Sequence, residues 1–234
     1  MNAVSLIGLT IMVSLLSGGF GSVKALAQQS APATQSMEKL PADIHPDSLS
    51  RIPRAKREDL TTEEERQAFD RLVGANAISQ TGPLGPTGTR LHFPIAAELY
   101  RNAVRWIREN AGLEPRFVEL AILVATRETN GQYEWLAHEP SALEAGLLQE
   151  TIDIVKFKRD TKELGEKEQV LIRFGREMSR EPKVSSKTFA DMERLFGRKG
   201  TLAVTMLIAH YSTSSILLHT YDQHLRPEQK PPFP

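Results

Sequence analysis

Apolar positions recur at helical spacing along most of the chain, and runs of alternating β-branched residues are missing. Residues three and four apart share one face of a helix, so the pattern predicts helices rather than strands. The predicted helices cover approximately residues 61–73, 95–111, 115–130, 133–145, 149–159, 166–179, 186–196 and 201–224. We therefore expect a compact all-α protein. Its centre should be the antiparallel pair 115–130 and 133–145, because the turn between these helices is short.

Several residues define how the predicted helices begin, bend and pack. Thr61 and Thr62 precede two glutamates in a capping-box arrangement, and Pro140 should kink or restart its helix. Residues 117–125 are apolar apart from Glu119, which predicts a helix buried on nearly all sides. The preceding helix carries one apolar stripe, formed by Ile95, Leu99, Ala103, Trp106 and Ile107.

The segment TGPLGPTGTRLHFP, residues 81–94, contains three glycines, and we interpret it as a structural turn. A phosphate-binding loop is the alternative. No predicted strand precedes the segment, however, and Pro83 and Pro86 remove amide donors that a phosphate would need.

The first 27 residues predict a cleaved signal peptide, which implies a periplasmic or secreted protein. Residues 3–16 are nearly all apolar, and Ala25-Leu26-Ala27 gives a small-x-small cleavage pattern. No Lys or Arg precedes the apolar run, so a retained anchor is the alternative, although the run is short for a span of about 20 residues. We expect no stable membrane span after processing. Residues 28–50 should form a flexible leader, residues 51–226 the helical domain and residues 227–234 a Pro-rich tail.

Composition excludes several classes of function. Lys plus Arg and Asp plus Glu both number 29, so no net charge favours a nucleic-acid partner. The 234 residues include no cysteine, which excludes disulfides, thiolate metal sites and every thiol mechanism.

The candidate chemistry lies in the predicted antiparallel pair, at Glu119, Glu134 and His138. Glu119 precedes the turn by about three helical turns and His138 follows it by about two, so both can reach one depth of the interhelical groove. A carboxylate beside an imidazole orients the ring and raises its basicity, as a general base requires.

Structural alternatives exist for each of these residues. Spacing alone also suits a surface pair of Glu134 with His138, and Glu119 could form a buried ion pair with Arg127 or Arg101. Tyr133 and Trp135 are aromatic residues typical of cores and interfaces. Among the late histidines, we expect His210 in the core with a hydrogen bond, and His219 and His224 at the solvent or an interface.

The stretch LEPRFVELAILVATRETNGQYEWLAHEPSALEAGL resembles the two-helix signature of the carboxymuconolactone decarboxylase/alkylhydroperoxidase D-like family. The shared features are an acid in an apolar helix, a Gly-containing turn, an aromatic-rich start, a histidine and an Ala/Leu-Glu-Ala-Gly end. The resemblance extends over roughly residues 50–225 and implies an alkylhydroperoxidase D-like fold. In the peroxidase branch, a glutamate lies nineteen residues before the histidine, as Glu119 does before His138. The two cysteine positions of that branch fall on Gly131 and Glu134.

The resemblance therefore implies a cofactor-free acid–base enzyme of the decarboxylase or lyase type, which acts on a small organic acid or lactone without thiol peroxidase chemistry. In this reading His138 is the proton donor or base, Glu119 orients it, and Glu134 is a second acid or base or positions the substrate. Tyr133 and Arg127 would contact the substrate, with Arg101 as the alternative to Arg127. Family members form trimers, hexamers or related rings, so a homo-oligomer is expected.

Two other functions remain open at this point. Glu119, Glu134 and His138 could instead hold Zn, Mn or Fe, since carboxylate and imidazole ligands suit these metals. The scaffold could also serve as a non-catalytic exported binding or assembly protein, which the loss of the redox cysteines would favour. A closed groove would support that function, and a strongly shifted histidine pKa in an open pocket would count against it.

Overall fold

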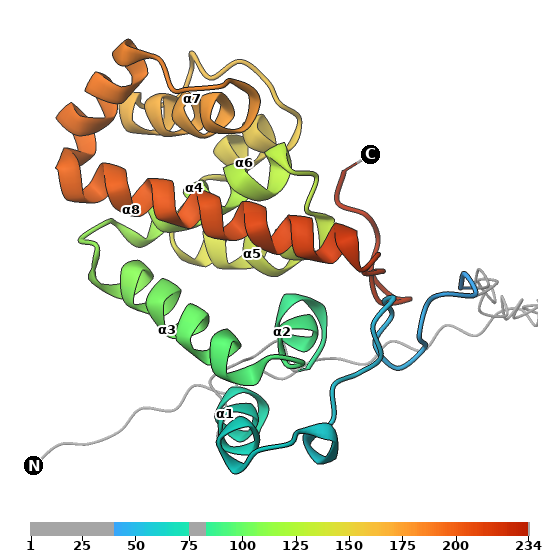
Figure 1. Ribbon diagram of the computed structural model, residues 1–234. Coiled ribbons are helices and arrows are strands. Elements are labelled where there is room, and N and C mark those ends of the chain that lie inside the picture. Colours follow the sequence, from blue (N-terminus) through green and yellow to red (C-terminus); the bar gives the residue numbers. More distant parts are fainter. Residues whose placement is uncertain (1–39, 75–82, 234) are drawn as a thin grey trace, which may run out of the picture. The chain divides into compact units, whose positions relative to one another are not determined.

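The computed structural model describes residues 40–74 and 83–233 (Figure 1). The predicted signal peptide and residues 28–39 of the predicted leader lie outside the described residues. The described residues form no strand, only one isolated bridge between His45 and Ser50, so the all-α prediction is confirmed for them. The helices are η1 (Arg57–Asp59), α1 (Glu63–Val73), α2 (Gly85–Arg90), α3 (Pro94–Asn110), α4 (Pro115–Glu128), α5 (Gln132–Glu144), α6 (Gln149–Lys156), α7 (Glu166–Arg180) and α8 (Ser186–Thr220).

Helix ends agree closely with the local sequence signals. The Thr62 side chain accepts a hydrogen bond from the Glu65 amide, and the Glu65 carboxylate accepts one from the Thr62 amide, which completes the predicted capping box. Pro140 lies inside α5, which continues through it to Glu144. The predicted break before the last helix lies within α8, at Gly197, whose φ of 66° is left-handed. Helix α2 was missed, because its six residues lie in the segment predicted as a turn.

Helix α4 is the centre of the main core and contacts α5, α6, α7 and α8. All of its residues from Phe117 to Thr126 are buried, as the apolar run predicts. Burial of one large apolar side chain contributes about 1.5–3 kcal/mol, so this helix is a major source of stability. Figure 1 shows α4 and α5 as neighbours beside the long red helix α8.

Helix α3 belongs to a second, smaller layer, in which α1 packs against α3 through Leu72 and Ala97. Helices α2 and α3 join this layer to α8. The apolar stripe predicted in α3 does not face the core as a whole: Ile107 packs on the core, but Leu99 is 68% exposed and Trp106 is 60% exposed. The physical reason is that α3 turns a different face, which carries Arg101, Arg105 and Arg108, towards the cavity that α5 and α8 also line.

The ordered fold extends beyond both domain boundaries predicted at residues 51 and 226. Ile44 is buried, and the His224 amide donates to the Leu49 carbonyl at 2.8 Å. At the other end, Phe233 is buried against Trp135, with ring centroids 5.4 Å apart. Residues 40–50 are therefore not a flexible leader, and residues 227–233 contribute to the core, because each segment carries an apolar side chain that finds a partner in the helical domain.

Among the described residues, one helix, α8, is long and apolar enough to cross a membrane. This test considers only length and composition. Half of its most apolar window is buried inside the protein, which is also the pattern of a core helix. Its packing against α4 and α7 accounts for the buried half of that window.

Candidate functional site

Glu119 and His138 meet across the α4–α5 pair, as their spacing predicts. The His138 ring donates through Nδ1 to Glu119 Oε2 at 2.9 Å, and the Glu119 side chain is buried. The other oxygen of Glu119 accepts from the Arg108 guanidinium at 2.5 Å. Arg108 also donates to the Tyr211 hydroxyl at 2.9 Å. Glu119 is therefore held between a cation and an imidazole, which fixes the orientation of the His138 ring.

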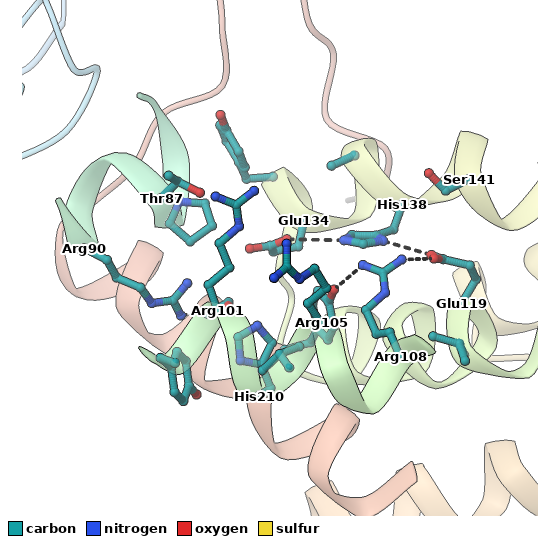
Figure 2. A pocket seen from close by; sticks show the side chains of 18 of the residues that line it. Thr87, Arg90, Arg101, Arg105, Arg108, Glu119, Glu134, His138, Ser141 and His210 are labelled. Carbon is teal, nitrogen blue, oxygen red and sulfur yellow. Dashed lines mark hydrogen bonds and ion pairs between the residues drawn. The ribbon is translucent and has the colours of Figure 1, made fainter. Parts of the chain in front are cut away.

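Glu134 faces the opposite edge of the same ring. Its Oε2 lies 3.8 Å from His138 Nε2, one helical turn along α5. Burial is the main cause that raises the pKa of Glu134, while nearby His138, Arg90 and Arg108 act in the opposite direction. A carboxyl group with a raised pKa carries its proton to higher pH than an ordinary glutamate. The three residues thus form a line, Glu119–His138–Glu134, in which a fixed carboxylate and a second acid flank one imidazole (Figure 2).

This line forms part of the wall of a cavity of about 690 Å³. Such a volume lies within the range of small-molecule sites. The lining includes Glu109 and Ala137, which are exposed, so the cavity opens to solvent. The walls come from α2, α3, α5 and α8, together with the start of α4 and Leu72 of α1.

Four arginines line the same cavity: Arg90 from α2, and Arg101, Arg105 and Arg108 from α3 (Figure 2). The three on α3 follow one another at intervals of four and three residues, so they share a helix face. Only Arg108 forms an ion pair with a carboxylate within the described residues. Glu119 is therefore paired with Arg108, and not with Arg127 or Arg101 as the sequence suggested.

His210 and Tyr211 close the α8 side of the cavity. The Tyr211 ring stands edge-on to His138 at 4.9 Å and to His210 at 4.8 Å between centroids. Burial, with the charges of Arg90, His138 and Arg108, lowers the pKa of His210 to about 3. Its Nδ1 is buried without a hydrogen-bond partner in the described residues. The prediction of a hydrogen-bonded core histidine was wrong for the described residues, because the ring lies at the cavity wall between Tyr100 and Tyr211 and its Nδ1 has no partner there.

The remaining predicted residues differ in their placement. Tyr133 lines the cavity, and its ring lies so close to Gly85 that a Cβ there would overlap it. Arg127 is not among the described residues that line the cavity. Its Nε donates to the Lys156 carbonyl at 2.6 Å, and its guanidinium stacks on Phe233. Helix α4 therefore turns Arg127 towards α6 and the C-terminal segment, and substrate contact at Arg127 stays a prediction.

The metal alternative lacks a converging set of ligands. Within residues 40–74 and 83–233, no group of three or more His, Asp or Glu side chains could hold one ion. Glu119 and Glu134 lie on opposite nitrogens of His138, so their oxygens cannot approach one point together with the imidazole.

Gly131 and Glu134 differ in what surrounds them. A Cβ at Gly131 would overlap the Ser215 side chain of α8, so a larger residue here would have to displace that side chain. Glu134 supplies a carboxyl group to the cavity.

Sequence reasoning missed Arg90, Arg105, Arg108, His210 and Tyr211 as cavity residues. The spacing of the α3 arginines was a usable signal, since 101, 105 and 108 lie on one helix face. No local signal identified Arg90 or His210, which reach the cavity only through the packing of α2 and α8. Comparisons with protein-family models, with curated proteins and with solved structures found no match.

Proposed function

We propose that this protein is a cysteine-less relative of the carboxymuconolactone decarboxylase/alkylhydroperoxidase D-like family and acts as a cofactor-free acid–base enzyme on a small organic acid or lactone. The observation that carries the proposal is the line Glu119–His138–Glu134 at the wall of an open cavity. The sequence resemblance supports the family, and the helical pair α4–α5 supports the corresponding fold.

The line suits a proton transfer between substrate and protein. Ionised Glu119 accepts the Nδ1 hydrogen of His138, which leaves the Nε2 lone pair free to take a proton on the cavity side. Glu134, protonated more readily than an ordinary glutamate, can give a proton to a carbanion or enolate carbon, and His138 can then restore it. The arginines offer positive charge to a carboxylate or to a developing enolate oxygen.

Two features count against a thiol peroxidase and against a non-catalytic binding protein. Thiol peroxidase chemistry needs a thiolate, and the sequence contains no cysteine. A non-catalytic binding protein would not need an acid–base line, and the cavity that holds this line is open to solvent.

The test is turnover of a panel of small lactones, β-keto acids and hydroperoxides, followed by NMR, with wild type and His138→Ala. We expect turnover of a lactone or carboxylate, no peroxide reduction, and a loss of about 10²–10⁴-fold in kcat for His138→Ala. His219→Ala is the matched control, since His219 is exposed and its one bond within the described residues is to the Asn130 carbonyl. Undiminished turnover in His138→Ala would refute the proposed role of the line.

The proposed assembly is a homo-oligomer, a trimer or hexamer. Large apolar side chains are exposed on α3 and α8, where they could pack against another subunit, and they are Leu99, Trp106, Leu202, Met206 and Ile216. Sedimentation of wild type and Leu202→Glu tests this: we expect an oligomer that dissociates in the variant, and a monomeric wild type would contradict it.

Export to the periplasm or the medium is proposed from the predicted signal peptide. Mass spectrometry of the protein recovered from its native host should give a chain that begins at Gln28. A chain that retains residues 1–27 would instead support an anchor.

A further inference from the structure

Arg90 is a cation without a matching anion among the residues that the structure describes. Its guanidinium donates to Ser214 Oγ at 2.9 Å and lies over the Tyr100 ring, 5.2 Å from the centroid. Within the described part of the chain, no carboxylate lies within ion-pair distance of it. A guanidinium has five N–H donors and stays charged in proteins, so most of its hydrogen-bonding capacity is unused here. Burial of such a group is costly unless an anion compensates it.

His210 adds a second unused polar group at the same place. Its ring lies 4.8 Å from Tyr100, the residue on which Arg90 stacks, and its buried Nδ1 has no partner in the described residues. A neutral imidazole can donate one hydrogen bond from its protonated nitrogen. Arg90, Ser214 and His210 all line the cavity described above.

Arg101 and Arg105 form a second group of cations, which reach the cavity from α3 and have no ion pair with any described residue (Figure 2). The side-chain bonds of Arg101 and Arg105 within the described residues are long, at 3.5 Å to the Leu72 carbonyl and 3.3 Å to Asn102 Oδ1. The two guanidinium groups lie one turn apart and repel each other, which an anion between them would relieve.

We infer that the cavity binds a small dicarboxylate at two points: one carboxylate on Arg90, with Ser214 and His210, and the other on Arg101 and Arg105. Charge supports an anionic ligand. The lining has four guanidinium groups against the three carboxyl groups of Glu109, Glu119 and Glu134, and burial raises the pKa of Glu134, which favours its uncharged form.

Two-point binding would place the middle of the ligand beside the acid–base line. Glu134 and His138 line the same cavity as the four arginines, and His138 lies one turn further along α5 than Glu134. The inference includes that a carbon between the two carboxylates is the one presented to Glu134 and His138. This inference rests on the proposed function for the identity of the reacting carbon, but the binding itself can be measured without turnover.

The experiment is isothermal titration calorimetry with malonate, succinate, glutarate and adipate, and with the monoamide of the tightest binder. The monoamide keeps the shape of the ligand and removes one charge. We expect wild type to prefer the dicarboxylate over its monoamide by at least tenfold, with affinity that falls as salt is added. Arg90→Met and Arg105→Met should each weaken dicarboxylate binding by about 10- to 100-fold, as the loss of a charge-assisted hydrogen bond implies.

Controls separate a binding effect from a folding effect. Arg198→Met removes an exposed arginine far from the cavity in the sequence, and its dicarboxylate affinity should equal that of wild type. Arg90→Lys keeps the charge but loses the planar fork. It should bind the dicarboxylate more weakly than wild type and still prefer it over the monoamide. If Arg90→Met does not fold, Arg90→Lys tests the role of Arg90 instead, and wild-type affinity in Arg90→Lys would then overturn the inference.

Three results would overturn the inference: no binding of any dicarboxylate, equal affinity for dicarboxylate and monoamide, or wild-type affinity in folded Arg90→Met. The proposed function fails in a different way. If dicarboxylates bind through Arg90 but His138→Ala leaves turnover unchanged, the subsite stands and the acid–base role of His138 does not.

Discussion

Arg108→Met should destabilise the fold because it leaves the buried charge of Glu119 without its cationic partner. The Glu119 side chain is 6% exposed, and Arg108 is 34% exposed while it donates to both Glu119 and Tyr211. Loss of one partner of a fully buried ion pair costs about 3–5 kcal/mol. Since a third of the Arg108 side chain contacts solvent, we expect a smaller loss of about 2–3 kcal/mol, of which the hydrogen bond to Tyr211 supplies about 1 kcal/mol.

Urea denaturation at pH 7, followed by far-UV circular dichroism, measures the free energy of unfolding of these variants. The double variant Arg108→Met/Glu119→Gln should recover more than half of the loss, because no buried charge remains unpaired. Arg198→Met is the control: its side chain is 93% exposed, and we expect a change within about 0.5 kcal/mol. The reasoning fails if Arg108→Met matches this control, or if the losses of the two single variants simply add in the double variant.

Three further predictions concern the site and the core. Burial raises the pKa of Glu134 above 4.5, so its proton stabilises the fold fully below pH 4.5, and this contribution is lost as pH rises through the folded-state pKa. Urea titrations from pH 4 to 8 should therefore show Glu134→Gln gaining stability over wild type, by about 1.4 kcal/mol for each unit of the pKa rise; a constant difference would contradict this. Gly131→Cys should lower stability by about 1–3 kcal/mol in a thermal melt, because its Cβ overlaps Ser215, and an unchanged Tm would argue against that contact. Phe233→Ala should cost about 3 kcal/mol in urea and shift the fluorescence of Trp135, whereas an unaltered spectrum would show that the two rings do not pack.

The sequence predicted most helices because their signals are local. The capping box at Thr62 and the apolar run of α4 act within one or two helical turns, so they define helix ends and burial without knowledge of the rest of the fold. The short α4–α5 turn likewise limits the pair to an antiparallel arrangement, which brings Glu119 to His138 at 2.9 Å.

The same reasoning failed where either of two faces of one helix could have packed against the rest of the protein. In α3, an apolar stripe with Leu99 and Trp106 competes with a stripe that carries three arginines. Helical periodicity shows which residues share a face, but the surfaces that pack on the helix decide which face turns inward. Here α5 and α8 supply Glu134 and His210, so the arginine face lines the cavity and the apolar stripe lies largely outside.

By itself, the sequence determined the helical class, the absence of thiol chemistry and the pairing of Glu119 with His138. Only the tertiary structure decided that Arg108 rather than Arg127 holds Glu119, that His210 borders a cavity, and that Phe233 completes the core. The reason is distance along the chain. Arg90 and Ser214 are 124 residues apart, and contacts of this kind depend on the packing of whole helices, which no local pattern records.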